Sequence, residues 1–97
     1  MPAYVSLSNF TDQGIKSVKD TVKRGEAIRQ AAAGMGGRII GIWWLMGQYD
    51  TMIIFEAPDD ETALRALVAN GMQGNLHSMT MRAFSEEEMT RVIGGLP

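Results

Sequence analysis

One segment of the sequence, Arg38 to Met46 (RIIGIWWLM), is apolar on both of the sides that an extended chain presents. It is bounded by glycines, too short for a typical helix, and rich in β-branched and aromatic residues, so we predict a strand. Successive side chains of a regular strand point to opposite sides. One side would carry Ile40, Ile42, Trp44 and Met46, and the other Ile39, Trp43 and Leu45. Any fold of this chain must cover both sides of that strand.

The chain has few residues with which to cover both sides of that strand. It has 97 residues, of which 45% are hydrophobic and 21% charged, values typical of one folded domain spanning residues 1–97. A domain of this size buries only about 60 to 65% of its unfolded surface. Since there is no cysteine and hence no disulfide, we expect oligomerisation or a bound ligand to add apolar contact.

Charge and hydropathy exclude several classes of partner. The net charge is -2 and Lys and Arg form no block, so we expect neither nucleic acid nor an anionic membrane as a partner. The start of the chain lacks the pattern of a secretory signal. The longest nearly apolar stretch, Ile39 to Gly47, has nine residues, whereas a spanning helix needs about twenty. We therefore expect a cytoplasmic protein without a membrane segment.

The remaining periodicities form two strand-helix-strand units. Residues Ala3 to Phe10 alternate as in a half-buried strand. Thr11 to Gly14 is expected to be a turn, and apolar or small residues then recur every three or four positions from Val18 to Met35, which predicts a helix. Glycines end that helix before the strand at Arg38 to Met46.

The second unit repeats the pattern. We predict a strand over Asp50 to Ala57, a helix with Asp59 at its N-cap, and a strand over Asn75 to Phe84. Ser85 and Glu88 have the spacing of a capping box, which predicts a short C-terminal helix.

The order β-α-β-β-α-β predicts an α+β, ferredoxin-like fold: a four-stranded antiparallel sheet with two helices on one face, plus the short C-terminal helix. The helices cover only one side of the strand at Arg38 to Met46. The other side would exceed the few hundred Å² of apolar patch usual for a soluble monomer. We therefore expect a homodimer or higher homo-oligomer in which sheet packs on sheet.

Residues in the predicted central hairpin carry a resemblance to a known family. Gly47, Tyr49 and Asp50 stand where the two middle strands must turn. Four other segments match as well: Tyr4 to Leu7, Asn9 to Ile15, Glu56 to Asp60 and Arg82 to Ser85. The chain resembles the GYD domain family over nearly its whole length. The resemblance implies a dimeric α/β barrel, two ferredoxin-like sheets facing each other, in a family whose biochemical role is largely unassigned.

A second similarity is to the effector-binding domain of Lrp/AsnC-type regulators, which has a glycine followed by Tyr-Asp at its central hairpin. There the hairpin lies near an amino-acid effector site between subunits, which implies an amino-acid-like ligand near Gly47, Tyr49 and Asp50 here. This chain lacks a helix-turn-helix domain, so direct action on DNA does not follow.

The conspicuous residues have structural as well as functional interpretations. Gly47 and Asp50 suit a tight hairpin, because glycine takes positive φ and aspartate accepts bonds from free backbone N–H groups. Trp43 and Trp44 point to opposite sides, so at most one can line a pocket between facing sheets. The candidate ligand-binding residues are Ser6, Trp44, Tyr49, Asp50 and His77.

His77 is the only histidine, and no metal-ligand spacing surrounds it, so we predict no metal site and no cofactor. His77 and Tyr49 are the candidates for proton transfer, with Ser6 or Asn9 as hydrogen-bond donors. No phosphate loop, nucleophile elbow or paired histidine occurs.

Two classes of function remain open. The first is a non-catalytic homo-oligomeric module that binds a small apolar or amino-acid-like organic ligand between subunits. The alternative is a cofactor-independent oxygenase or isomerase of the dimeric α/β-barrel type. A haem-handling variant of the same fold would use His77 as its imidazole ligand.

Overall fold

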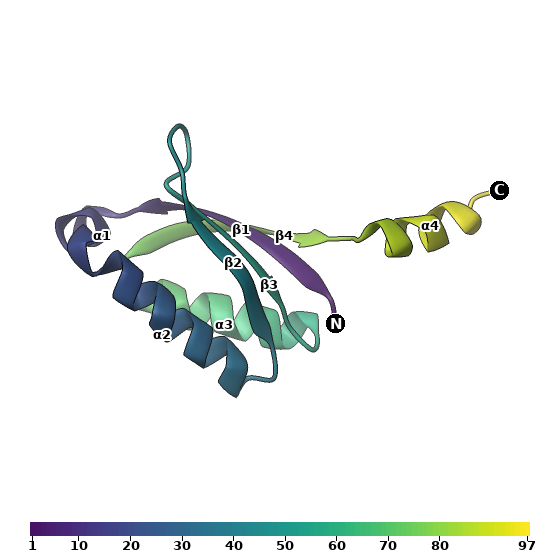
Figure 1. Cartoon of the computed structure of the whole chain (residues 1–97), viewed down its shortest axis with the longest axis horizontal. Coiled ribbons are helices and arrows are strands. Elements are labelled where there is room, and N and C mark those ends of the chain that lie inside the picture. Colours follow the sequence, from purple (N-terminus) through teal and green to yellow (C-terminus); the bar gives the residue numbers. More distant parts are fainter.

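The computed structural model describes all 97 residues and has a four-stranded antiparallel sheet at its centre (Figure 1). The strands are β1 (Ala3–Phe10), β2 (Arg38–Trp44), β3 (Thr51–Glu56) and β4 (Leu76–Ala83). Their order across the sheet is β2-β3-β1-β4. Helices α2 (Thr21–Gly34) and α3 (Asp60–Met72) lie on one face of the sheet. The predicted ferredoxin-like arrangement is confirmed, and no helix is long and apolar enough to cross a membrane.

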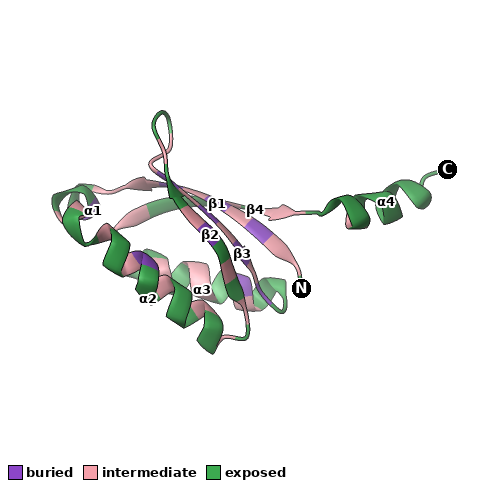
Figure 2. Ribbon diagram, viewed as in Figure 1, coloured by how far each residue is buried: buried purple, intermediate pink, exposed green.

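The core lies between this face and the two helices. Its buried apolar residues are Tyr4, Ile53, Phe55, Ala57 and Ala63. The rings of Tyr4 and Phe55, on neighbouring strands, stack with centroids 5.1 Å apart. Only 11 of the 97 residues are buried (Figure 2). The core therefore holds the helices to one side of the sheet and leaves much apolar surface outside.

Tyr4 also fixes the start of α3. Its hydroxyl donates a hydrogen bond of 2.5 Å to Oδ1 of Asp60, the first residue of that helix. Burial, together with the bond to the Asp60 carboxylate, raises the pKa of Tyr4 to about 12. Asp59 is the N-cap of α3 as predicted, since its carboxylate accepts from the Thr62 N–H at 2.7 Å.

Tyr4 should make stability depend on alkaline pH. Because its pKa is raised on folding, the contribution is complete below pH 10 and is lost as pH rises from about 10 to about 12. We expect the free energy of unfolding of Tyr4→Phe to fall less steeply over this range than that of the native chain, in urea titrations at each pH. Parallel curves for the two proteins would contradict this assignment.

Strand β2 departs from the predicted alternation. The register shifts between Ile39 and Gly41, where β2 has one residue more than β3. Ile39 opposes Phe55 and Ile42 opposes Ile53, so both isoleucines pack against the core. The prediction that Ile39 and Ile42 point to opposite sides was wrong, because a bulge between them shifts the pleat.

The connection from β1 to α2 is also more structured than expected. A short helix, α1 (Asp12–Lys16), and a 3-10 turn, η1 (Val18–Asp20), precede α2. The prediction of a turn at Thr11 to Gly14 was therefore wrong in part, as was the helix start at Val18. Thr11 caps α1 by accepting from the Gly14 N–H at 3.0 Å, and its hydroxyl donates to the Gly74 carbonyl.

Gly14 is packed where no side chain fits. A Cβ at this position would overlap the carbonyl oxygen of Asn75. We expect Gly14→Ala to lower the free energy of unfolding by about 1–3 kcal/mol, the usual cost of overpacking. Gly34→Ala is the control, because nothing lies within 4 Å of a Cβ there and restricting the unfolded chain adds about 0.4–1 kcal/mol of stability. Equal urea midpoints for both variants would show that α1 does not need this close contact.

The last helix, α4 (Glu86–Gly94), projects away from the body (Figure 1). The predicted capping box is present: the Ser85 side chain accepts from the Glu88 N–H, and the Glu88 carboxylate accepts from the Ser85 N–H. The radius of gyration is 14.7 Å, whereas a compact chain of this length has about 12.5 Å. The projecting helix accounts for the elongated shape, 52 × 31 × 18 Å.

Candidate functional site

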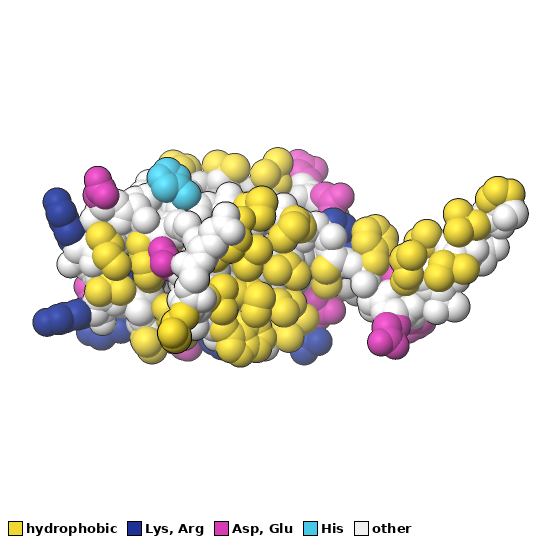
Figure 3. Space-filling model, turned by 90° about the horizontal axis from the view of Figure 1, so that it is seen from above, with side chains coloured by type: hydrophobic (Ala, Val, Ile, Leu, Met, Phe, Trp, Pro, Cys, Tyr) yellow, Lys and Arg dark blue, Asp and Glu magenta, His cyan; other side chains and the backbone are white.

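The sheet face opposite α2 and α3, here called the open face, is apolar. Along β1, Tyr4, Ser6 and Ser8 are buried under the helices, so the residues between them point to the other side. The strand registers place seven apolar side chains there: Val5, Leu7, Trp43, Met52, Ile54, Met79 and Met81. Seen from above, they form a continuous hydrophobic surface (Figure 3). A soluble monomer rarely exposes such a surface unless another molecule binds it.

Trp43 gives the open face a flat region on β2. Its indole ring lies over Gly41 of the same strand, so closely that a Cβ at Gly41 would overlap the ring. The side chain is nevertheless 44% exposed. The broad face of a large aromatic ring is thus presented to solvent, as is common for residues that anchor protein interfaces.

The hairpin between β2 and β3 stands at one end of the open face (Figure 1). Asp50 holds its base: Oδ2 accepts from the Phe10 N–H at 2.9 Å, and the Asp50 N–H donates to the Ser8 carbonyl at 2.9 Å. Gly47 has φ 127°, a conformation that favours glycine. The Asn9 side chain donates to the Gln48 carbonyl at 3.1 Å. Gly47 and Asp50 therefore have the structural roles expected of them, but the hairpin is not tight, because β2 ends at Trp44 and β3 begins at Thr51.

Helix α4 carries a second apolar surface. Met89, Val92 and Ile93 lie on the helix, Leu96 follows two residues after its last residue, and all four are 48–64% exposed at a helical spacing. In Figure 3 the hydrophobic side chains of this helix lie on the same side as the open face. The name α4 stripe is used below for these four residues.

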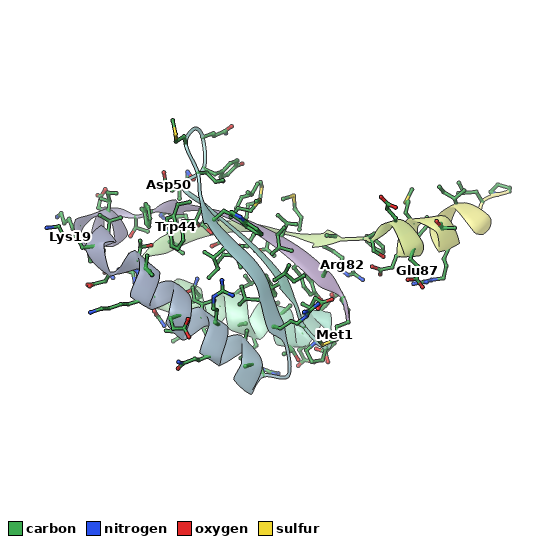
Figure 4. All side chains as sticks on the ribbon, in the orientation of Figure 1. Met1, Lys19, Trp44, Asp50, Arg82 and Glu87 are labelled. Atoms are coloured by element: carbon green, nitrogen blue, oxygen red, sulfur yellow. The ribbon has the colours of Figure 1, made fainter.

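Arg82 joins α4 to the sheet (Figure 4). Its guanidinium forms an ion pair of 3.1 Å with Glu88 and lies 4.4 Å from the centre of the Phe84 ring. The bond from the Ser85 N–H and the nearby Arg82 cation hold the pKa of Glu88 below its usual value. Arg82 thus links the first turn of α4 to β4, and the helix does not lie on its own sheet.

The sequence of this chain is similar to known proteins over most of its length. The sequence profile of the GYD domain matches residues 4–93. The chain belongs to the GYD domain family. A Thermus thermophilus protein named "Glutamine synthetase and cystathionine beta-lyase binding protein" is 30% identical over 84 residues, which span 86% of this chain and 88% of that protein. The resemblance to the GYD domain family seen in the sequence is thereby confirmed.

The residues predicted to form a site in this GYD domain do not gather in one place. Ser6 is buried under the helices and accepts from the Thr80 hydroxyl at 2.9 Å. The Trp44 Nε1–H donates to the Thr21 hydroxyl at 3.0 Å, which places the ring beside α2 (Figure 4). His77 opposes Asn9 and is exposed on the open face. Tyr49 lies in the hairpin loop, half-buried, and its hydroxyl makes no hydrogen bond within the chain.

This placement separates the groups that an enzyme would combine. Trp44 is on the edge strand β2 and His77 on the opposite edge strand β4. Three strand spacings lie between these edges, about 14 Å, and the two side chains face opposite sides of the sheet. No group of three or more His, Cys, Asp or Glu side chains is placed to hold a metal ion.

Two features of the GYD domain were missed in the sequence. Trp43, and not Trp44, faces the open side, because the bulge at Gly41 fixes the pleat. For the segment that carries the α4 stripe, the sequence predicted only a short capped helix. Its spacing was visible, but nothing in the sequence showed that the helix leaves the body.

Asp50 provides a test of the hairpin. In Asp50→Ala the half-buried Phe10 N–H loses its acceptor, so we expect a loss of about 1–3 kcal/mol in the free energy of unfolding. Asp50→Asn keeps an acceptor oxygen and should lose less, and Tyr49→Phe should melt like the native protein. If Tyr49→Phe lost as much free energy of unfolding as Asp50→Ala, the tyrosine hydroxyl would have a structural role too.

Proposed function

We propose that this GYD domain is a non-catalytic homodimeric binding module that pairs through its open face and holds other proteins through α4. The observation that carries the proposal is the continuous apolar surface of the open face. With only 11 buried residues, the isolated chain has a small core, and a second sheet would enlarge it. A two-fold dimer suits this surface, since the same patch serves on both copies.

The α4 stripe supports the second half of the proposal. An amphipathic helix that projects from the body can lay its apolar residues into a groove of another protein. The relative from Thermus thermophilus is named for binding two enzymes, glutamine synthetase and cystathionine β-lyase. We propose that the partner of this chain is likewise a folded enzyme, held by the α4 stripe.

The other functions expected from the sequence are less well supported by the geometry. Ser6 and Trp44 lie on the helix side and His77 on the open side, so these groups cannot contact one small substrate together. The enzyme hypothesis that combines Trp44 with His77 therefore lacks an assembled site, and for haem the chain offers only His77, exposed on the open face. A small ligand between subunits and a cytoplasmic location stay predictions.

Dimerisation is tested by placing a charge in the open face. In Ile54→Glu the carboxylate would be buried between the sheets. Burying an unpaired charge is so unfavourable that the dimer should dissociate. We expect the native chain to sediment as a dimer of about 21 kDa, twice its 10.6 kDa, and Ile54→Glu as a folded monomer. The matched control is Leu64→Glu, because Leu64 is 61% exposed on α3. A native protein that is monomeric at micromolar concentration would overturn the proposed dimer.

Variants of α4 test whether this helix binds the proposed enzyme partner. Purified glutamine synthetase from the source organism is titrated with native protein, Val92→Asp and Thr90→Asp. Val92 belongs to the α4 stripe, whereas the Thr90 hydroxyl donates back to the Glu86 carbonyl of its own helix. We expect Val92→Asp to lose at least tenfold in affinity and Thr90→Asp to change little. Equal affinities for the two variants would exclude the α4 stripe as the binding surface.

A further inference from the structure

A cavity of about 200 Å³ lies on the helix side of the sheet, between α2 and α3. Alanines at the facing positions of the two helices, Ala31 and Ala66 among them, keep the helices from filling it. An apolar cavity of roughly 150 Å³ is large enough for benzene. Ala31 and Ala69 line the cavity and are exposed, so it opens to solvent between the helices. A small organic molecule could enter without unfolding the core.

The lining is polar at one end and apolar at the other. Ser8 opposes both Ser78 and Thr51 at the end of the sheet near α1, and Ser8 and Ser78 line the cavity there. At the other end Phe55 opposes Ile39, and both are lining residues. Helix α2 lies along the same direction. Arg24, near its start, lines the serine end, and Met35, its C-cap, lines the apolar end. At 1.5 Å per residue these two positions are about 16 Å apart along the helix.

Arg24 is the only charged residue of the lining. Its guanidinium donates to the Ser17 carbonyl at 2.9 Å, to the Ser17 hydroxyl at 3.2 Å and to the Gly14 carbonyl at 3.5 Å. None of these acceptors is an anion, and Arg24 forms no salt bridge, unlike Arg38, Arg65, Arg82 and Arg91. A guanidinium has five N–H donors, so some remain free. A half-buried cation without a counter-ion favours an anionic ligand.

Neighbouring polar groups also lack partners. Ser8 and Ser78 share one hydrogen bond of 2.8 Å, which leaves one of their two hydroxyl hydrogens available. The side-chain amides of Asn70 and Gln73 line the same end and make no hydrogen bond within the chain. The hydroxyl of Thr51, a residue only 4% exposed, has no partner either. It borders a smaller hollow of about 30 Å³ that Arg24 also lines.

We propose that this cavity binds a small monocarboxylate with an apolar tail. The carboxylate lies at Arg24 with the serine hydroxyls and the Asn70 and Gln73 amides, and the tail extends toward Phe55 and Met35. A straight tail of about eight carbons is shorter than the distance between the two ends, so it can extend from Arg24 toward Met35 without leaving the cavity. The proposal does not depend on the proposed dimer or on the enzyme partner, because the open face and α4 lie on other surfaces.

The experiment is a calorimetric titration of the native protein with octanoate, with 1-octanol as the uncharged probe of the same tail. We expect octanoate to bind at least tenfold more tightly than octanol. Arg24→Gln should reduce octanoate affinity at least tenfold and leave octanol affinity unchanged. Arg29→Gln is the matched control, since Arg29 is exposed on the same helix and does not line the cavity.

A cavity-filling variant tests whether the two probes bind in the cavity or elsewhere on the surface. Ala66→Leu should abolish binding of both probes while the protein stays folded and keeps its oligomeric state. If Arg24→Gln disturbs α1 and fails to fold, the preference of the native protein for octanoate over octanol still decides the role of charge. Equal affinity for the two probes would overturn the carboxylate assignment. Binding that survives Ala66→Leu, or no octanoate binding at all, would overturn the site.

Discussion

Strand β1 is hydrogen-bonded on both edges, to β3 on one side and β4 on the other, and these two ladders determine where every other surface lies. Because side chains alternate, the same eight residues supply Tyr4, Ser6 and Ser8 to the helix side and Val5 and Leu7 to the open face. A slip of one residue in either ladder would exchange the two sets. The small core, the serine end of the cavity and the apolar open face therefore depend on one register.

Many of the large apolar side chains of this short chain lie outside its core. A larger core would require the helices to approach each other, but alanines on α2 and α3 leave a cavity between them. The open face and the α4 stripe hold apolar side chains that contribute little to the isolated fold. This distribution is understandable if part of the stabilising contact comes from other molecules, because a small domain without disulfides gains stability from any added apolar contact.

The sequence predicted those parts of the fold that depend on neighbours along the chain. The bounds of β1 follow from its alternation, and the caps at Asp59 and Ser85 follow from local hydrogen-bonding chemistry. The errors arose where distant segments decide. The bulge in β2 exists only relative to β3, and α1 depends on a close approach of Gly14 to Asn75. The cavity was not predictable either, because it is defined by the separation of two helices that the sequence does not give.

The two adjacent tryptophans, Trp43 and Trp44, lie in different environments on opposite sides of one sheet, and the bulge beside Gly41 determines which of them faces the open side. Indole fluorescence responds to the polarity and quenching groups around the ring, so each tryptophan reports on its own side. Protein containing only Trp43 would signal the covering of the open face, while protein containing only Trp44 would signal changes around Thr21 and the start of α2. Assembly and events under the helices can thus be followed separately, in the same solution and without an added label.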